Sequence, residues 1–146
     1  MEEKIKEAQM LFEGSYNCAQ STLSVFDNEL GISKETLQHL SSGFGAGMCY
    51  QGRTCGAVAG AYMALGLISG KSFREPEMIK ENTYQLIREF NKKFVEKHGS
   101  TLCKELLEID ISSAQGIEIA RQKGVFETRC PNFVATAVAL IHSQIK

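Results

Sequence analysis

Apolar residues recur at helical spacing along most of the chain, in segments that begin at helix-capping residues or at proline. Pro76 and Pro131, the two prolines, each precede such a segment, and proline is favoured at the first position of a helix. Long runs of alternating β-branched residues, which would indicate strands, are absent from the sequence. The sequence therefore predicts an all-α protein, a single compact bundle of about seven helices. The segments expected to be helical are 3–12, 17–30, 34–42, 55–69, 77–98, 101–109 and 114–124, with a last helix that begins at Pro131.

One segment interrupts this helical pattern. The stretch GFGAGMCYQG, residues 43–52, has four glycines among ten residues. Glycine destabilises a helix because its backbone loses more conformational freedom on folding than that of any other residue. We expect a loop here, at a place where a second backbone segment or a ligand can come close to Cys55.

The size and charge of the chain narrow the classes of function. With 146 residues, the chain is expected to form one helical domain, residues 1–146, that is large enough for its own hydrophobic core. Its formal net charge is −1 and no run of basic residues occurs, so a nucleic-acid partner is not expected. The charged start lacks the apolar core of a signal peptide, and no apolar stretch is long enough to span a bilayer. We therefore expect a cytoplasmic protein.

The cysteines follow the predicted helix starts. In a cytoplasmic protein, five cysteines favour metal binding or thiol chemistry over stable disulfides. Asn17 and Thr54 are favoured capping residues and each is followed at once by a cysteine. The four cysteines that are expected in the first turns of four different helices are Cys18, Cys55, Cys103 and Cys130.

This placement predicts a shared site. The N-terminus of a helix favours a thiolate and lowers the pKa of a thiol, although small buried cysteines also occur without any chemical role. We expect the four sulfurs to meet in one region, with Cys49 on the neighbouring glycine-rich loop. Cys55 is expected to be the most reactive thiolate, because Gly56 leaves it unshielded and Arg53 adds a positive charge nearby.

The motifs around these cysteines resemble a known family. The segments TCGAVAG, NCAQS and RCPNFV resemble those of the redox-active family named for its C-GCAxxG-C-C pattern, whose four cysteines correspond to Cys18, Cys55, Cys103 and Cys130. Cys55 and Gly56 stand in the reverse order from the family's name, and Cys49 lies outside the pattern. The resemblance implies a helical, cytoplasmic, redox-active protein. The family is also distantly similar to the domain of split-Soret cytochromes, whose subunits dimerise and carry haem and an iron–sulfur centre. The sequence has no C-x-x-C-H motif for covalent haem.

Three mechanisms remain open from the sequence. Thiol–disulfide chemistry with Cys18, Cys55, Cys103 and Cys130 as catalytic residues is the first, and its partner would be a redox protein or a small thiol. The second is a metal site, in which the same four cysteines hold an iron–sulfur cluster or zinc. The third is a helical module that binds a small ligand or haem and has structural cysteines. Gly56 and Gly60, one helical turn apart, are candidate cofactor-binding residues, and a homodimer is a further expectation.

Overall fold

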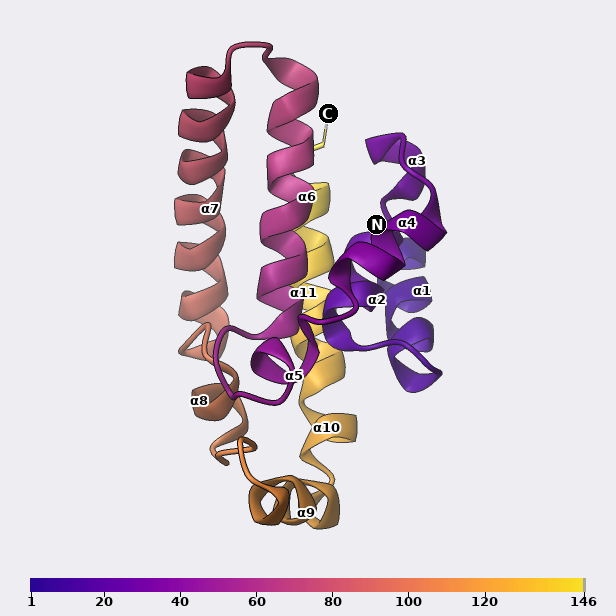
Figure 1. Ribbon diagram of the computed structural model, residues 1–146, viewed down its shortest axis with the longest axis vertical. Coiled ribbons are helices and arrows are strands. Elements are labelled where there is room, and N and C mark those ends of the chain that lie inside the picture. The colour runs from indigo at the N-terminus through magenta and orange to yellow at the C-terminus, as the bar shows by residue number, and fades with distance from the viewer. Residues whose placement is uncertain (146) are drawn as a thin grey trace.

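The computed structural model describes residues 1–145, and its regular elements are all helices (Figure 1). Seven of them, α1, α2, α4, α6, α7, α9 and α11, have seven or more residues, so the predicted all-α bundle is confirmed. The helices are α1 (Glu2–Glu13), α2 (Cys18–Ser24), α3 (Asp27–Leu30), α4 (Lys34–Ser41), α5 (Gly45–Met48), α6 (Gly56–Ser72), α7 (Pro76–His98), α8 (Cys103–Leu107), α9 (Ala114–Lys123), α10 (Val125–Thr128) and α11 (Cys130–His142).

Three long helices and a group of shorter ones pack around a common core. Helices α6 and α7 form an antiparallel hairpin, and α11 packs against both of them (Figure 1). Helices α1 to α4 lie together on another side of α6, where α2 packs against α6, α4, α11 and α1. The largest fully buried side chains come from both groups and include Phe26, Leu65, Phe94 and Val134. The shorter elements α5, α8 and α10 gather near the beginnings of α6 and α11 (Figure 1).

The close packing of α2 against α6 depends on small residues. A Cβ atom added to Gly60 would lie 2.9 Å from the carbonyl oxygen of Ala19, a distance that real Cβ atoms do not adopt. Gly60 therefore lets the two backbones approach each other. Most residues of α6 are apolar, and its buried residues include Ala57, Val58, Ala61 and Ala64.

Some helix boundaries differ from the predicted ones. The segment 17–30 is not one helix, because Val25 and Phe26 break it into α2 and α3. Both residues are buried, and the Lys4 ammonium of α1 donates a 3.0 Å hydrogen bond to the carbonyl oxygen of Val25 at the end of α2. The short helix α10 was not expected, because four residues are too few to show a helical period.

The glycine-rich stretch is a loop that contains a left-handed turn. Residues 46–50 all have positive φ angles between 53° and 67°, and we call them the left-handed turn. For a residue with a side chain, this conformation costs roughly 1–2 kcal/mol. Gly47 lies in the tightest place, because a Cβ atom there would lie 2.7 Å from both the Arg53 nitrogen and the Cys103 Cβ. Hydrogen bonds from the Cys49 nitrogen to the Gly45 oxygen (2.8 Å) and from the Arg53 nitrogen to the Gly47 oxygen (3.0 Å) hold the turn.

Within residues 1–145, none of the helices combines the length and the apolar character that crossing a membrane requires.

Candidate functional site: a cavity lined by four cysteines

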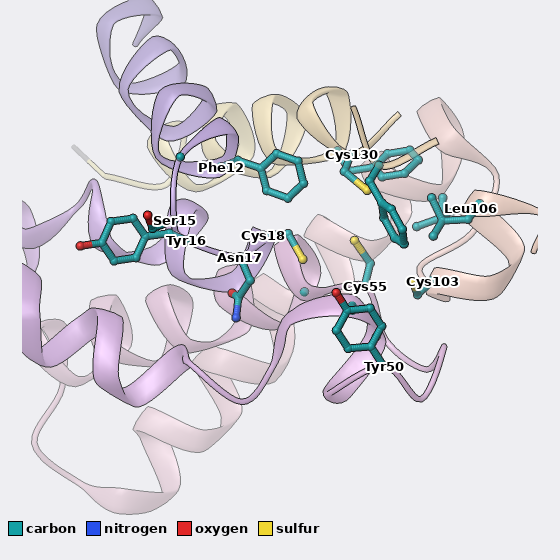
Figure 2. A pocket seen from close by; sticks show the side chains of 17 residues that line it. Phe12, Ser15, Tyr16, Asn17, Cys18, Tyr50, Cys55, Cys103, Leu106 and Cys130 are labelled. Atoms are coloured by element: carbon teal, nitrogen blue, oxygen red, sulfur yellow. The ribbon is translucent and has the colours of Figure 1, made fainter. Parts of the chain in front are cut away.

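The four cysteines at the expected helix starts line one cavity of about 340 Å³, which we call the cysteine cavity (Figure 2). Cys18, Cys103 and Cys130 are the first residues of α2, α8 and α11, and Cys55 is the N-cap of α6. The predicted first-turn positions and the predicted meeting of these residues are both confirmed. Cys49 is exposed on the neighbouring left-handed turn and does not line the cavity.

A capping box positions Cys18. The Asn17 side-chain oxygen accepts a hydrogen bond from the Gln20 backbone nitrogen (2.9 Å), and the Gln20 side chain accepts one from the Asn17 backbone nitrogen (3.0 Å). These reciprocal bonds fix the first turn of α2. The Asn17 amide also donates to the Ser42 carbonyl oxygen at the end of α4 (2.9 Å), so Cys18 has a fixed place relative to two helices.

A short backbone pairing positions Cys55 and Cys103 together. Thr54 and Leu102 form an isolated antiparallel bridge. Beside it, the Cys55 nitrogen donates to the Thr101 oxygen (2.8 Å), and the Cys103 nitrogen donates to the Arg53 oxygen (2.6 Å). Because Thr54 takes part in this pairing, it does not cap α6. The same pairing keeps residues 101 and 102 out of α8, so this helix begins at Cys103 and not at residue 101 as expected.

An arginine ties the start of α11, and with it Cys130, to the end of α8. The Arg129 guanidinium donates to the Leu106 carbonyl oxygen (3.0 Å) and forms an ion pair with Glu108 (2.9 Å). Pro131 is the second residue of α11, one position later than expected, and its carbonyl oxygen accepts a hydrogen bond from Gln9 of α1 (3.2 Å).

The rest of the cavity wall is uncharged and mostly apolar or aromatic, with Ser15 and Asn17 as polar members. None of the described residues that line the cavity has a charged side chain. Figure 2 shows Phe12 and Tyr50 on opposite sides of the Cys18 and Cys55 sulfurs. Besides the cysteines, the lining consists of Phe12, Gly14, Ser15, Tyr16, Asn17, Ala46, Gly47, Tyr50, Gly56, Leu106, Leu107, Phe126 and Phe133.

Comparison with known proteins places this arrangement in a family. The sequence profile described as "Putative redox-active protein (C_GCAxxG_C_C)" matches residues 16–144, a range that includes all four cavity cysteines. The chain belongs to the C_GCAxxG_C_C family. It is also 28% identical over 144 residues to an uncharacterised protein of Archaeoglobus fulgidus, covering 93% of this chain and 89% of that protein. No solved structure matches the chain.

Burial dominates the acidity of the four C_GCAxxG_C_C cysteines. Burial raises the pKa of Cys55 well above its usual value and raises the pKa of Cys103 to about 12. It also raises the pKa values of Cys18 and Cys130. The expectation that helix starts lower these pKa values is therefore wrong, because loss of hydration outweighs the helix ends.

The sulfurs also act on one another. A negative charge on Cys18 further raises the pKa of Cys55, of Cys103 and of Cys130. A charge on Cys103 acts on Cys130 in the same direction. Cys130 also acts on Cys55, so Cys18 and Cys130 are each electrostatically linked to the other three cysteines of the family motif.

Backbone amides surround the Cys18 sulfur. Backbone hydrogen bonds from Ala46, Cys18, Ala19 and Gly56 oppose the burial effect and lower the pKa of this thiol. Cys55 has two such bonds, from Val58 and Ala57, and its pKa is raised well above the usual value. These pKa directions favour Cys18, which receives more compensation for its burial, whereas the expectation that Cys55 is the most reactive thiolate stays a prediction.

The two glycines of the family motif have different surroundings. Gly56 lines the cavity, and a Cβ atom on it would lie 2.3 Å from the Cys18 sulfur, so this sulfur packs directly against the start of α6. Gly60 does not line the cavity, and its Cα faces Ala19 and Thr22 of α2. Gly56 thus remains a candidate for ligand contact, whereas the observed contacts of Gly60 are those of helix packing.

The side chains of the described residues do not form a ready-made metal site. Among residues 1–145, no group of three or more His, Cys, Asp or Glu side chains is arranged so as to hold a metal ion. All five cysteines are free thiols.

Sequence reasoning missed the aromatic part of the cavity. Phe12, Tyr50 and Phe126 come from α1, the left-handed turn and α10, and no spacing in the sequence connects them. The one available signal was the glycine-rich stretch, which was expected to approach Cys55 and which contributes Ala46, Gly47 and Tyr50 to the wall.

Proposed function

We propose that this protein is a thiol–disulfide redox protein whose reacting groups are the four cysteines of the cavity. The observation that carries the proposal is the meeting of Cys18, Cys55, Cys103 and Cys130 from four separate helix starts around one cavity. The family's description supports the same general class of chemistry. We place this activity in the cytoplasm, where cysteines are kept available as thiols.

Cys18 and Cys55 are the primary redox pair in this proposal. The Cys18 sulfur packs against Gly56, the neighbour of Cys55, and its charge is the largest charge effect on the Cys55 pKa. A thiol of a partner protein or a small thiol attacks the Cys18–Cys55 disulfide as a thiolate, which gives a mixed disulfide with Cys18 and releases Cys55. A second thiol then attacks the outer sulfur of the mixed disulfide and releases Cys18. Two external S–H bonds are replaced by one S–S bond, and both protons end on Cys18 and Cys55.

Cys103 and Cys130 form the second pair in this proposal. Both line the cavity as the first residues of α8 and α11, and a charge on Cys103 raises the pKa of Cys130 after the larger effects of burial and Cys18. Exchange between the two pairs needs no external reagent, because a Cys103 or Cys130 thiolate that attacks the first disulfide transfers the S–S bond within the cavity.

The test uses the reduced protein under anaerobic conditions. Addition of diamide, a neutral thiol oxidant, is expected to remove thiols in pairs and to yield a peptide cross-linked between Cys18 and Cys55 in mass spectrometry. Dithiothreitol is expected to restore both thiols. The variant Cys49→Ser should behave like the wild type, because Cys49 lies outside the cavity. If Cys49 reacts while the four cavity thiols stay reduced, the proposal is wrong.

A metal centre held by the same four cysteines is the second candidate. The backbone hydrogen bonds around the Cys18 sulfur favour it, because such bonds also tune the sulfurs of iron–sulfur clusters. Two observations rank it below thiol chemistry: within residues 1–145 the side chains form no group of three or more ligands placed to hold a metal ion, and the widely spaced cysteines include no C-x₂-C pair. Metal analysis of protein that is purified without oxygen decides between the two: near-stoichiometric iron or zinc that is lost in Cys55→Ser would put the metal centre first.

A further inference from the structure

The cysteine cavity has the size of a small-molecule site. Its volume of about 340 Å³ lies within the range of roughly 300–1,000 Å³ that is typical of ligand pockets. Thiol exchange by itself needs only access to one sulfur, so the dimensions of this cavity call for a separate explanation.

The wall of the cavity selects against charged molecules. The residues that line it have no charged side chain, and burial keeps the cysteines in their neutral form. A carboxylate or phosphate that entered this cavity would lose its hydration without gaining a counter-ion. The cavity therefore fits a neutral molecule.

Aromatic rings and the Tyr50 hydroxyl define the shape and polarity of that molecule. Phe12, Tyr50, Phe126 and Phe133 offer ring faces and edges, which pack well against a flat ring. Three lining residues, Ser15, Tyr16 and Tyr50, carry hydroxyl groups. Figure 2 shows the Tyr50 hydroxyl beside Cys55, whereas Ser15 and Tyr16 lie farther from the sulfurs. The Tyr50 hydroxyl is available as a donor to a carbonyl oxygen at the edge of a bound ring.

We propose that the cavity binds a neutral quinone and that this quinone is the oxidant of the Cys18–Cys55 pair. The inference rests on the proposed thiol–disulfide function and names the substrate class of the same site. In the reaction, the two S–H bonds break and one S–S bond forms. Two electrons and two protons pass to the two carbonyl oxygens of the quinone, which leaves as the hydroquinone.

The charge balance of this reaction suits the cavity. Two neutral thiols and a neutral quinone become a neutral disulfide and a neutral hydroquinone, so the net charge in the cavity is the same before and after. Backbone hydrogen bonds from Ala46, Ala19 and Gly56 stabilise the negative charge that forms transiently on the Cys18 sulfur. A charged acceptor has no comparable compensation among the side chains of the wall.

The test uses duroquinone, tetramethyl-1,4-benzoquinone, as the probe, because its substituted ring does not form stable adducts with thiols. Reduced full-length protein is mixed with it anaerobically, and quinone absorbance and protein thiols are followed together. We expect one Cys18–Cys55 disulfide for each quinone reduced. A ring-sulfonated quinone of matched reduction potential is expected to react much more slowly, because its charge opposes entry.

Binding is measured separately from oxidation in a Cys18→Ser/Cys55→Ser variant, which lacks the primary pair. In this background, Tyr50→Ala is expected to weaken duroquinone binding by about three- to tenfold, since one ring contact and one donor are lost. Tyr84→Ala is the matched control, because Tyr84 is an exposed tyrosine on α7 that does not line the cavity. It should leave the affinity unchanged.

The outcomes separate this inference from the proposed function. If diamide forms the Cys18–Cys55 disulfide but duroquinone neither binds nor oxidises the protein, the quinone inference is wrong and the thiol–disulfide function stands. Equal rates with the sulfonated quinone, or equal effects of Tyr50→Ala and Tyr84→Ala, would also overturn the inference. If no oxidant forms the disulfide, both proposals fail.

Discussion

The Cys18 sulfur is surrounded by backbone amides from three segments that are distant in sequence. Cys18 and Ala19 belong to α2, Gly56 begins α6, and Ala46 belongs to the left-handed turn. A thiol at this point keeps a raised pKa because it is buried, yet it is the cavity thiol with the most backbone hydrogen bonds. A residue's place at a helix start therefore says less about its acidity than its burial and the number of amides it faces.

The order in which the thiols react with iodoacetamide tests this ranking. In the reduced protein, exposed Cys49 is expected to react first and Cys18 next, while Cys55, Cys103 and Cys130 react last. The rate at Cys18 should still increase above pH 9, because the pKa of this thiol is raised and the thiolate is the reacting form. Mass-spectrometric site assignment over a series of pH values measures both effects. Labelling of Cys55 before Cys18 would contradict the ranking.

The position of the Cys18 sulfur depends on the absence of a side chain at Gly56. The variant Gly56→Ala places a methyl group 2.3 Å from the present position of that sulfur and is expected to destabilise the fold by about 1–3 kcal/mol. It should also slow formation of the Cys18–Cys55 disulfide. Gly70→Ala on the same helix is the control: nothing lies within 4 Å of an added Cβ, so it should stabilise the protein by roughly 0.5–1 kcal/mol. Urea unfolding measures both, and equal effects would contradict the packing argument.

Among the elements, the left-handed turn is the one whose backbone conformation opposes its residue types. Ala46, Met48, Cys49 and Tyr50 all have positive φ angles, which residues with a side chain rarely adopt. In return, the turn brings the Ala46 amide to the Cys18 sulfur and Tyr50 to the cavity wall. Strain at such a place is typical of functional sites.

Glycine at position 49 should relieve part of this strain. Cys49 is exposed and has a φ angle of 58°, so Cys49→Gly removes a strained side chain without removing a buried contact. We expect a stabilisation of about 0.5–1 kcal/mol after the entropy cost of glycine is included. Lys93→Gly on the exposed face of α7 should instead destabilise the protein by about 1 kcal/mol. A loss of stability in both variants, measured by thermal unfolding, would contradict the strained description of the turn.

Local signals in the sequence were enough for most elements but not for the chemistry of the cavity. The helices expected over 77–98 and 114–124 begin and end within one residue of those bounds, because caps and stops act within a few residues of the chain. The pairing of Thr54 with Leu102 was not predictable, since it joins segments far apart in sequence and displaces the expected caps. The convergence of the cysteines was predicted, whereas the sign of their pKa shifts was not, because burial is a property of the folded chain.

At the scale of the whole molecule, contacts between early and late segments close the bundle around the cavity. Gln9 of α1 donates to the carbonyl oxygen of Pro131 in α11, and Arg129 joins α11 to α8. The fold thereby encloses several thiols that stay protonated, and this has a consequence for stability. Above pH 9, the unfolded chain releases thiol protons that the folded chain retains, so the unfolded state binds fewer protons and stability falls as pH rises.

For Cys103, this loss should extend from about pH 9 to about pH 12, the interval between its ordinary pKa and its raised pKa. The free energy of unfolding of the reduced protein, measured by urea at several pH values, is expected to decrease over this range. In Cys103→Ala the decrease should be smaller, although the variant is less stable at neutral pH. Parallel curves for the two proteins would show that Cys103 does not contribute to the alkaline loss.

The enclosure of neutral thiols also fixes how the reduction potential of the protein depends on pH. An ordinary dithiol stops taking up protons on reduction near pH 8.5, and its potential then becomes less dependent on pH. The pKa values of Cys18 and Cys55 are raised, so their couple takes up one proton for each electron well above that pH. Its midpoint potential should therefore fall linearly with pH into the alkaline range, by about 59 mV per pH unit. This slope is twice roughly 30 mV, the change in potential that a tenfold change in equilibrium constant produces in a two-electron couple, because two protons are taken up. Equilibration with dithiothreitol buffers at several pH values measures this slope. A slope of this size would mean that the proposed Cys18–Cys55 couple carries hydrogen atoms rather than electrons alone.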